Sequence, residues 1–482
     1  MSGVLVIDVG TSSVRAALVD DGGAVLHVAR RATPASVPFP GLVEFDPAAL
    51  ARAALEAAAE TLARCPTPPL ALGVTTQRAS TVAWDGVTGQ PVGPGLGWQD
   101  LRTVGRCLEL QGAGLRFSPS ESATKFAWHV EQMGADRPAD LRLGTVDSWI
   151  VWNLTGGARH LTDATNAGVT GLYSAATGGW RGDRLEVLGL DPAWLPQITD
   201  TAGDLGVAVS LGDLPLTAVV GDQQASLIGQ SCTRPGLAKA TFGTGAMLDV
   251  CLGPNPPSAE VRTERGCFPI IAWRIAGALT WGSEAIMLCA GSAVDWLVED
   301  LGVLDDAAAS QVVAAGCQDA SGVIMVPALL GFGTPQWDFG ARGSVFGLTR
   351  GSGRAQLVRA VLEGVAHSGA DLLEATEVDT GLSIPSLRVD GGMSVNEVFV
   401  QALADACGRP VEVSPEMEAT TLGAGYLAGL RVGMWDDLDQ IAAAWSPRVV
   451  VAPSGRDPGR DRWREATERA GHWIPDLSGI RF

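Results

Sequence analysis

Two short segments combine acidic and small residues in an arrangement that suits phosphoryl chemistry. Asp8 ends an apolar run and leads into the tight turn Gly10-Thr11-Ser12-Ser13, and a second turn, Gly243-Thr244-Gly245, lies in mid-chain. Such turns expose backbone N–H groups, and glycine lets the backbone approach a ligand closely. Two turns that face each other could hold the phosphates of a nucleotide, and Asp8 could hold Mg²⁺ through the ion's water shell.

A third segment, Gly221-Asp222-Gln223-Gln224, lies shortly before the second turn. An alcohol has too high a pKa to ionise before it attacks phosphorus, so a base within hydrogen-bond reach must accept its proton. Asp222 is the candidate for this base. The residue types also allow plainer readings: Asp8 could stabilise a turn, the glycine turn could be a simple hairpin, and Asp222 could be a surface residue.

The composition excludes several other classes of protein. The 482-residue chain has a formal net charge of −19, which opposes nucleic-acid binding because phosphate backbones need clustered Lys and Arg. The two lysines, Lys125 and Lys239, lie outside any Gly-x-x-x-x-Gly-Lys-Ser/Thr motif, and no Gly-x-Gly-x-x-Gly run occurs. If this acidic chain binds a polyphosphate, backbone N–H groups and a divalent cation must supply the positive charge.

Cysteine, histidine and apolar residues indicate an ordinary cytoplasmic protein. The eight cysteines show no Cys-x-x-Cys spacing and the five histidines are scattered, so we expect reduced core cysteines and no transition-metal site. No apolar run is long enough to span a bilayer, and the short run before Asp8 lacks a basic leader. We therefore expect a cytoplasmic location, with no membrane and no nucleic acid as partner.

The hydrophobic pattern predicts an α/β protein with a mixed sheet in its N-terminal half. Asp46-Pro47 is a typical helix start, with Asp as the N-cap and Pro at the first position. The order strand, strand, strand, helix, strand favours a mixed sheet with helices on its faces. The predicted elements are strands at 4–9, 14–18, 24–30 and 70–74 and a helix at 46–64.

Strands and helices also alternate in the C-terminal half. We expect Thr420 or Thr421 to cap a helix that runs through Leu430. No low-complexity linker divides the chain, so a boundary near residue 230 is inferred from the motifs, giving domains 1–230 and 231–482 with a ligand cleft between them. The other predicted elements are strands at 323–327 and 386–390 and helices at 356–376 and from 395.

Over nearly its whole length the chain resembles the FGGY carbohydrate kinases, and most of all their glycerol kinase branch. The resemblance implies two actin-like, ribonuclease-H-like domains that close on ATP and a sugar or polyol. It is strong because the motifs occur in one order and spacing: Asp8–Ser13, Thr76-Gln77-Arg78, Trp98–Thr103, Gly221–Gln224, Phe242–Gly245, Gly343–Leu348 and Val389-Asp390-Gly391-Gly392.

The resemblance implies a role for each matching residue. Asp222 matches the family's base, Asp8 would act on Mg²⁺, and Arg78, Trp98 and Gln223 would contact the acceptor. Where glycerol kinases have a Gln near the nucleotide, this chain has Asp295, whose role is left open. The residues expected to hold the nucleotide are Gly10, Thr11, Ser12, Ser13, Gly243, Thr244, Gly245, Gly291, Gly391, Gly392 and Asn396.

The acceptor pocket is where the chain departs from glycerol kinases. Ala79 stands at the position of their pocket Glu, Ser120 at that of their Tyr, and Met247 at that of their Phe. Two of these changes remove hydrogen-bonding groups, and a buried polar substrate needs its hydroxyls paired. We therefore expect ATP-dependent phosphorylation of a polyol or sugar larger than glycerol.

Three other functions stay open at this point. The chain could be a true glycerol kinase, a non-kinase actin-like ATPase, or an inactive sugar-binding homologue. The acceptor set argues against the ATPase, because such proteins need no sugar pocket, and the presence of Asp8 and Asp222 argues against lost turnover. A homodimer is compatible with the sequence but not indicated by it.

Overall fold

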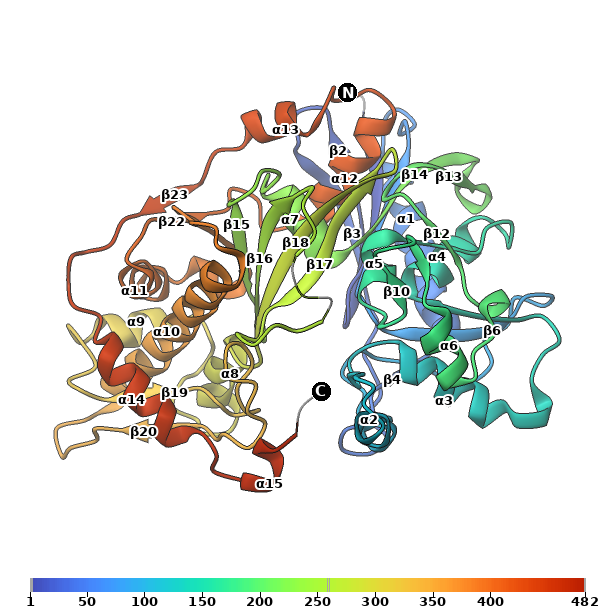
Figure 1. Cartoon of the computed structure of the whole chain (residues 1–482). Coiled ribbons are helices and arrows are strands. Elements are labelled where there is room, and N and C mark those ends of the chain that lie inside the picture. Colours follow the sequence, from blue (N-terminus) through green and yellow to red (C-terminus); the bar gives the residue numbers. More distant parts are fainter. Residues whose placement is uncertain (1–2, 258, 260, 481–482) are drawn as a thin grey trace.

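The computed structural model describes residues 3–257, 259 and 261–480. Two lobes stand side by side and share one 13-stranded sheet (Figure 1). The N-lobe is built on strands β13, β14, β5, β1, β2 and β3, and the C-lobe on β17, β18, β16, β15, β21, β22 and β23, in that spatial order from the junction outward. One parallel pair, Ala202 with Ile275, joins β13 to β17 and so links the two halves of the sheet.

The strands of the large sheet have the following bounds. In the N-lobe they are β1 (Gly3–Val9), β2 (Ser13–Asp20), β3 (Val25–Ala32), β5 (Leu72–Thr76), β13 (Ala202–Ala208) and β14 (Leu214–Gly221). In the C-lobe they are β15 (Ala238–Phe242), β16 (Ala246–Gly253), β17 (Phe268–Ile275), β18 (Ala278–Met287), β21 (Leu387–Asp390), β22 (Val411–Val413) and β23 (Val449–Val451).

The predicted mixed sheet of the N-lobe is confirmed. Strand β1 pairs antiparallel with β2 and parallel with β5, and β2 pairs antiparallel with β3. Helix α1 (Pro47–Arg64) begins behind Asp46, whose side chain accepts the N–H groups of Ala48 and Ala49. Because side chains alternate along a strand, Leu5 and Ile7 pack with α1 while Asp8 points to the opposite face.

Alternation has the same effect in the C-lobe. The long helix α10 (Arg354–Thr380) packs against Ala240, Leu248 and Ala285 on one face of the sheet. The neighbouring residues Lys239, Asp249 and Glu284 occupy the other face, where β15, β16 and β18 place them directly beside one another. Three charged side chains therefore share the sheet face that is turned away from α10.

Two helices each pack on the lobe opposite the strand that precedes them in the sequence, and they cross at the junction. Helix α7 (Asp222–Gly229) follows an N-lobe strand but packs on β16 and β17, while α12 (Ala419–Arg431) lies on β1, β5 and β14 of the N-lobe. At the crossing, a Cβ built at Gly229 would overlap the carbonyl of Ala419, and one at Gly423 would overlap that of Ala225. Glycine at both positions lets the backbones touch, which fixes the start of α7 relative to both sheets.

The predicted cap of α12 is wrong. The helix begins at Ala419 after Glu418, so Thr420 and Thr421 both lie inside its first turn. The Thr421 hydroxyl instead donates to Asp8 Oδ2 at 3.3 Å, from a helix of the C-terminal half of the chain that packs on the strand carrying Asp8. The Thr421 hydroxyl therefore binds a residue distant in the sequence and does not cap its own helix.

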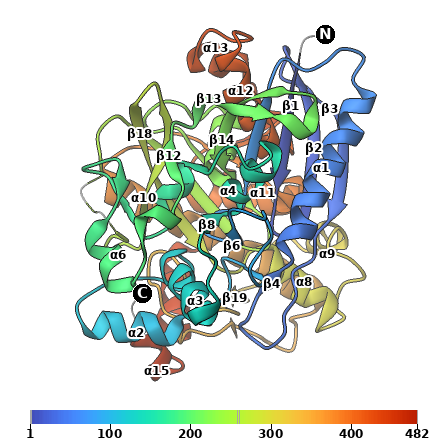
Figure 2. The same ribbon diagram turned by 90° about the vertical axis from the view of Figure 1, so that its right-hand side faces the viewer.

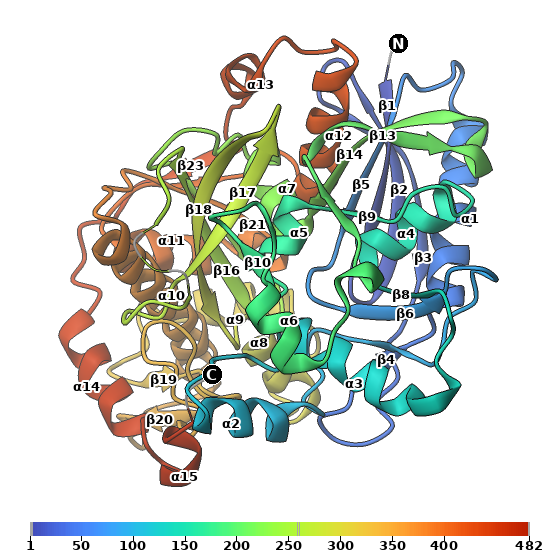
Figure 3. The same ribbon diagram turned by 45° about the vertical axis from the view of Figure 1, so that its right-hand side comes forward.

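A smaller four-stranded sheet lies below the N-lobe sheet and is best seen in Figures 2 and 3. It has the order β4 (Glu44–Phe45), β7 (Gly95–Leu96), β6 (Thr81–Asp85) and β8 (Leu141–Thr145), and α3 (Ala123–Met133) packs near it. The segment after β7 carries Trp98 toward the junction of the lobes.

The remaining helices connect or cover these sheets. They are α2 (Val104–Gly112), α4 (Val146–Leu154), α5 (Ala164–Gly168), α6 (Gly182–Leu188), α8 (Gly291–Glu299), α9 (Ala309–Ala315), α11 (Glu397–Cys407), α13 (Leu438–Ala444), α14 (Arg460–Ala470) and α15 (Pro475–Ser478). The short strands β9 (Leu161–Asp163) with β12 (Gln197–Thr199), β10 (Tyr173–Ser174) with β11 (Gly179–Trp180), and β19 (Ile324–Val326) with β20 (Ser344–Phe346) form three separate pairs. Across the described ranges, no helix has the length and apolarity needed to cross a membrane.

The helix crossing predicts an unusual response to Gly423→Ala. Alanine normally stabilises a helix relative to glycine, but here the added methyl group meets the Ala225 carbonyl of α7. We expect unfolding in urea to show a loss of about 1–3 kcal/mol. Gly105→Ala is the matched control, because Gly105 is an exposed helical glycine whose added Cβ would meet no atom within 4 Å. Equal stability of the two variants would contradict the tight crossing.

Candidate active site

Asp222 lies where an N-lobe strand turns into the junction helix. Strand β14 ends at Gly221, and α7 begins at Asp222. The Gln223 N–H donates to Asp222 Oδ1 at 2.8 Å, so the helix start holds one oxygen of the carboxylate. A Cβ at Gly221 would lie 2.8 Å from Arg78 Cδ, so glycine here leaves room for Arg78 to cross the helix start.

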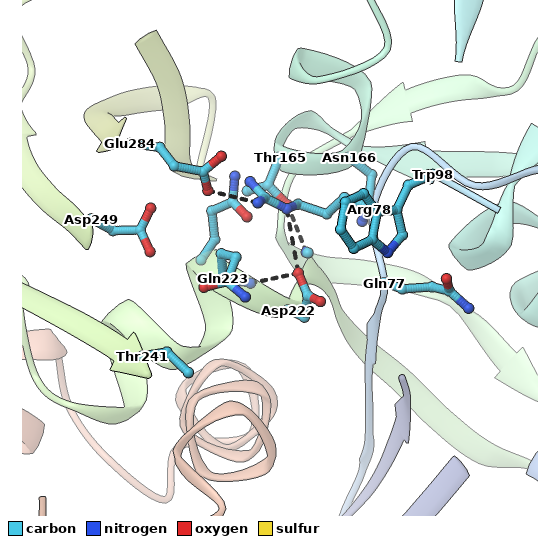
Figure 4. A network of polar contacts seen from close by, with 12 residues as sticks. Gln77, Arg78, Trp98, Thr165, Asn166, Asp222, Gln223, Thr241, Asp249 and Glu284 are labelled. Atoms are coloured by element: carbon cyan, nitrogen blue, oxygen red, sulfur yellow. Dashed lines mark hydrogen bonds and ion pairs between the residues drawn. The ribbon is translucent and has the colours of Figure 1, made fainter. Parts of the chain in front are cut away.

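Arg78 bridges the two lobes (Figure 4). Its Nε lies 3.3 Å from Asp222 Oδ1 of the N-lobe, and its Nη2 lies 2.6 Å from Glu284 Oε2 on β18 of the C-lobe. The side chains of Arg78 and Glu284 are 11% and 7% exposed, whereas that of Asp222 is 29% exposed. Of these three groups Asp222 is the one open to a ligand, and it holds the guanidinium less closely than Glu284 does.

The electrostatic surroundings suit Asp222 for a base. Burial raises the pKa of the Asp222 carboxyl above its usual range, and the negative charge of Glu284 raises this pKa further. The charge of Arg78 and the N–H of Gln223 act in the opposite direction. A carboxylate of raised pKa accepts a proton more readily than an ordinary Asp does.

A second ion pair lies behind Asp222, on the C-lobe face. Lys239 Nζ lies 2.7 Å from Asp249 Oδ2, and both side chains are fully buried. The same ammonium donates to Gln223 Oε1 at 2.7 Å and to Thr241 Oγ1 at 3.1 Å. The ammonium thus lies among three acceptors, and its hydrogen bond to Oε1 fixes the amide of Gln223.

The sequence reasoning missed Glu284, Asp249 and Lys239 as parts of the site. A usable signal was present, because each is the one charged residue of its strand. Such residues are rarely buried without a partner. What the sequence does not give is the pairing of β15, β16 and β18, which places the three charges side by side.

Asp8 faces the same junction from the end of β1. Its Oδ2 accepts from Arg15 Nη1 at 3.2 Å and from Thr421 at 3.3 Å. Burial raises the pKa of Asp8 to about 6, Arg15 opposes this, and the charge of Asp222 adds to it. The effect of the Asp222 charge on Asp8 indicates that the two carboxylates face one region of space.

The two turns predicted to bind phosphate belong to different lobes. Gly10 N–H donates to the Ser13 carbonyl at 3.0 Å and closes the turn between β1 and β2. In the C-lobe, Gly243 N–H donates to the Gly245 carbonyl at 2.9 Å between β15 and β16. Trp98 Nε1 donates to Thr11 Oγ1 at 3.3 Å, which links the segment after β7 to the first turn.

The structure places the other residues of the C-lobe predicted to hold the nucleotide near the second turn or just after β21. Gly291 N–H donates to the Gly243 carbonyl, and a Cβ at Gly391, which has φ 86°, would lie 2.5 Å from the Phe242 carbonyl. A Cβ at Gly392 would meet no atom within 4 Å. Asn396 caps α11: its Oδ1 accepts from the Phe399 N–H and its Nδ2 donates to Ser310 Oγ.

The acceptor-pocket candidates are spread more widely. Ala79 is buried next to Arg78 with φ 61°, and Met247 is half-buried on β16 opposite Ile286. Ser120 is exposed, and its hydroxyl pairs with that of Ser118. Buried Lys125 donates to the carbonyls of Trp98 and Ser120, both at 3.3 Å, and so ties those two segments together.

This fold and site define a two-lobed phosphotransferase. The N-terminal domain model of the FGGY family of carbohydrate kinases matches residues 3–229, and the C-terminal domain model of that family matches residues 238–432. The chain belongs to the FGGY family of carbohydrate kinases and is an ATP-dependent phosphotransferase that acts on a sugar or polyol.

Individual relatives agree with the family models. Glycerol kinases of Trichlorobacter lovleyi and Aromatoleum aromaticum are 38% and 39% identical, covering 98% of this chain and 99% and 100% of their own lengths. A Plasmodium falciparum glycerol kinase solved with ADP has a TM-score of 0.88 at 28% identity, covering 100% of this chain and 99% of its own. A ligand-bound xylulose kinase from Lactobacillus acidophilus has a TM-score of 0.87 at 19% identity, covering 99% of each chain, and shares the fold.

The open space at Gly392 predicts a selective effect of Gly392→Ala. The added methyl group meets no protein atom, so the melting temperature without nucleotide should equal that of the native protein. If the nucleotide lies against this backbone, the methyl group should weaken ADP binding about tenfold, or ~1.4 kcal/mol by calorimetry. Gly105→Ala is again the control. Unchanged ADP affinity would place the nucleotide elsewhere.

Proposed function

We propose that this chain transfers the γ-phosphoryl group of ATP in line to a hydroxyl of a polyol or sugar larger than glycerol. The observation that carries the proposal is the meeting of Asp222, Arg78 and Glu284 where the two lobes join. Phosphoryl transfer depends mainly on positioning and on neutralising charge, and both require a site built from two lobes that can close on the reactants.

In this mechanism Asp222 is the general base. Its Oδ1 is engaged by Gln223 and Arg78, which leaves Oδ2 to accept the proton of the acceptor hydroxyl. Removal of this proton accompanies or follows attack on phosphorus, because the free alkoxide is too basic to form first. Arg78 Nη1 is buried without a hydrogen-bond partner in the described structure, and an acceptor oxygen would satisfy it.

Gln223 and Trp98 would complete the acceptor contacts. Lys239 holds the Gln223 amide oxygen, so the amide N–H groups remain to donate to an acceptor hydroxyl. The Trp98 indole lies between the first phosphate turn and the acceptor side, as its hydrogen bond to Thr11 indicates. Both residues would orient the acceptor toward the γ-phosphate.

The site fits a magnesium ion held mostly by water and phosphate. Among the described residues, no group of three or more His, Cys, Asp and Glu side chains forms a metal cage. Mg²⁺ does not need one, since it keeps several waters and takes one or two carboxylates. The raised pKa of Asp8 marks a buried carboxylate that a cation would favour in its charged form. When bound through Asp8, Mg²⁺ would neutralise charge on the phosphates.

The nucleotide would lie between the two turns. Gly10, Thr11, Ser12 and Ser13 would donate from the N-lobe, and Gly243, Thr244 and Gly245 from the C-lobe. Gly291 and Gly391 support the second turn, and Gly392 offers open backbone for the adenosine end. Asn396 would act here as a helix cap that positions the segment after Gly392, since both ends of its amide are engaged.

The size of the acceptor follows from three side chains. Ala79 is a buried methyl group beside Arg78, Ser120 turns its hydroxyl to Ser118, and Met247 is flexible. None of the three supplies a hydrogen bond into the pocket. A three-carbon triol would leave some of its hydroxyls unpaired there, whereas a longer chain can extend to polar groups beyond these three side chains.

Glycerol phosphorylation is the second candidate. It is favoured by the 38–39% identity to curated proteins named glycerol kinase over nearly the whole chain. Family membership sets aside the non-kinase ATPase considered from the sequence. An inactive homologue is opposed by the presence of both Asp8 and Asp222 at the junction.

The base is tested by Asp222→Asn. The amide keeps the shape of the side chain but cannot accept a proton, so kcat should fall by about 10²–10⁴ while ADP affinity changes little. Asp437→Asn, at the start of the remote helix α13, is the matched control and should keep full activity. An Asp222→Asn enzyme that keeps more than a tenth of kcat, with chemistry limiting turnover, would remove Asp222 from this role.

The acceptor is tested with a panel of polyols, ketoses and an acid. Each missing buried hydrogen bond costs about 1 kcal/mol or more, so two should lower kcat/KM for glycerol by about 10- to 100-fold against the best substrate. The panel is glycerol, erythritol, threitol, xylitol, xylulose, ribulose and gluconate, measured by ADP release. Highest kcat/KM with glycerol would identify the second candidate as correct.

A further inference from the structure

The carboxylates that pair with Arg78 and Lys239 outnumber these two cations. Three carboxylates, those of Asp222, Glu284 and Asp249, share two cations, Arg78 and Lys239. Asp249 and Glu284 lie directly opposite each other on β16 and β18, where like charges repel. Each of these two must therefore have a cation close by if both are ionised.

The distances show how the cations are divided. Lys239 is 2.7 Å from Asp249, and Arg78 Nη2 is 2.6 Å from Glu284. Asp222 is left with the 3.3 Å contact to Arg78 Nε, from a guanidinium that is already engaged. An Arg bound by both nitrogens to a single carboxylate forms a much stronger pair, which would hold that carboxylate in its charged form and weaken it as a base.

We propose that Glu284 is a positioning residue for proton transfer: by holding Arg78 from the C-lobe, it keeps the guanidinium from pairing fully with Asp222 and leaves Asp222 Oδ2 free for the acceptor hydroxyl. The proposal rests on the proposed role of Asp222 as base. It adds that the C-lobe sheet, and not only the N-lobe that carries Asp222, sets the strength of that base.

Charged groups from four elements act on Asp222 or respond to its charge. Arg78 approaches from the segment after β5, Glu284 from β18, Lys239 from β15 and Asp8 from β1. Asp249 acts one step further away, through Arg78 and Glu284. Glu284 differs from the others in that it both raises the proton affinity of Asp222 and competes for the cation that lowers it.

The test is the pH dependence of kcat/KM for the best acceptor of the panel, at saturating Mg²⁺ and ATP. In Glu284→Gln the side chain keeps its shape but loses its charge, so Arg78 should turn to Asp222 and stabilise its ionised form. The acid limb of the profile should then move down by about 0.5–1 pH unit, and kcat on the plateau should fall about tenfold. The KM for ATP should stay unchanged.

Glu377→Gln is the matched control. Glu377 forms an Arg pair of the same length, 2.6 Å to Arg409, in the same lobe but away from the junction. It should lose a similar amount of thermal stability while its pH profile stays that of the native enzyme. If Glu284→Gln also keeps the native acid limb and loses only stability, Glu284 is structural and the proposal is overturned.

Two further variants keep the test decisive. If Glu284→Gln does not fold, Glu284→Asp takes its place: its shorter side chain cannot reach Arg78 from the same backbone, so the limb should move the same way by less, and an unmoved limb overturns the proposal. Asp222→Asn separates the role of Asp222 as base from the positioning role of Glu284. Near-native activity of Asp222→Asn would show that Asp222 is not the base. If Asp222→Asn is inactive but the acid limb of the Glu284→Gln pH profile does not move, only the role of Glu284 is overturned.

Discussion

The structure depends on one electrostatic constraint, the sharing of two cations by three carboxylates where the lobes meet. Lys239 is committed to Asp249, and Arg78 lies closest to Glu284, so Asp222 keeps the weakest hold on a positive charge. Buried charges are costly unless paired, and the group left least paired is the one most able to take up a proton. The basicity proposed for Asp222 thus follows from the pairing of Arg78 with Glu284 and of Lys239 with Asp249.

The helix crossing and the strand alternation hold these charged groups in place. The crossing of α7 and α12 at Gly229 and Gly423 brings the start of α7 to a fixed place between the sheets. Strand alternation turns Lys239, Asp249 and Glu284 away from α10 and toward that place. Asp8 lies near the same region at the end of β1, where Thr421 of α12, a helix that packs on β1, donates to it.

Local motifs could be read from the sequence, and long-range pairing could not. The turn after Asp8, the glycine turn at 243–245 and the start of α1 at Asp46 depend on a few neighbouring residues, and each was predicted. The cap of α12 was predicted wrongly because Thr421 uses its hydroxyl on a residue more than four hundred positions away. Glu284 could not be predicted as a site residue for the same reason: its role depends on an ion pair with Arg78, which lies in the other lobe.

The most direct test is a crystal structure with Mg²⁺, a non-hydrolysable ATP analogue and the best acceptor. The account predicts that the reacting hydroxyl lies within hydrogen-bond reach of Asp222 Oδ2, in line with the γ-phosphorus, while Arg78 remains bound to Glu284. An Arg78 guanidinium paired by both nitrogens with Asp222, or a reacting hydroxyl bound to another carboxylate, would contradict it.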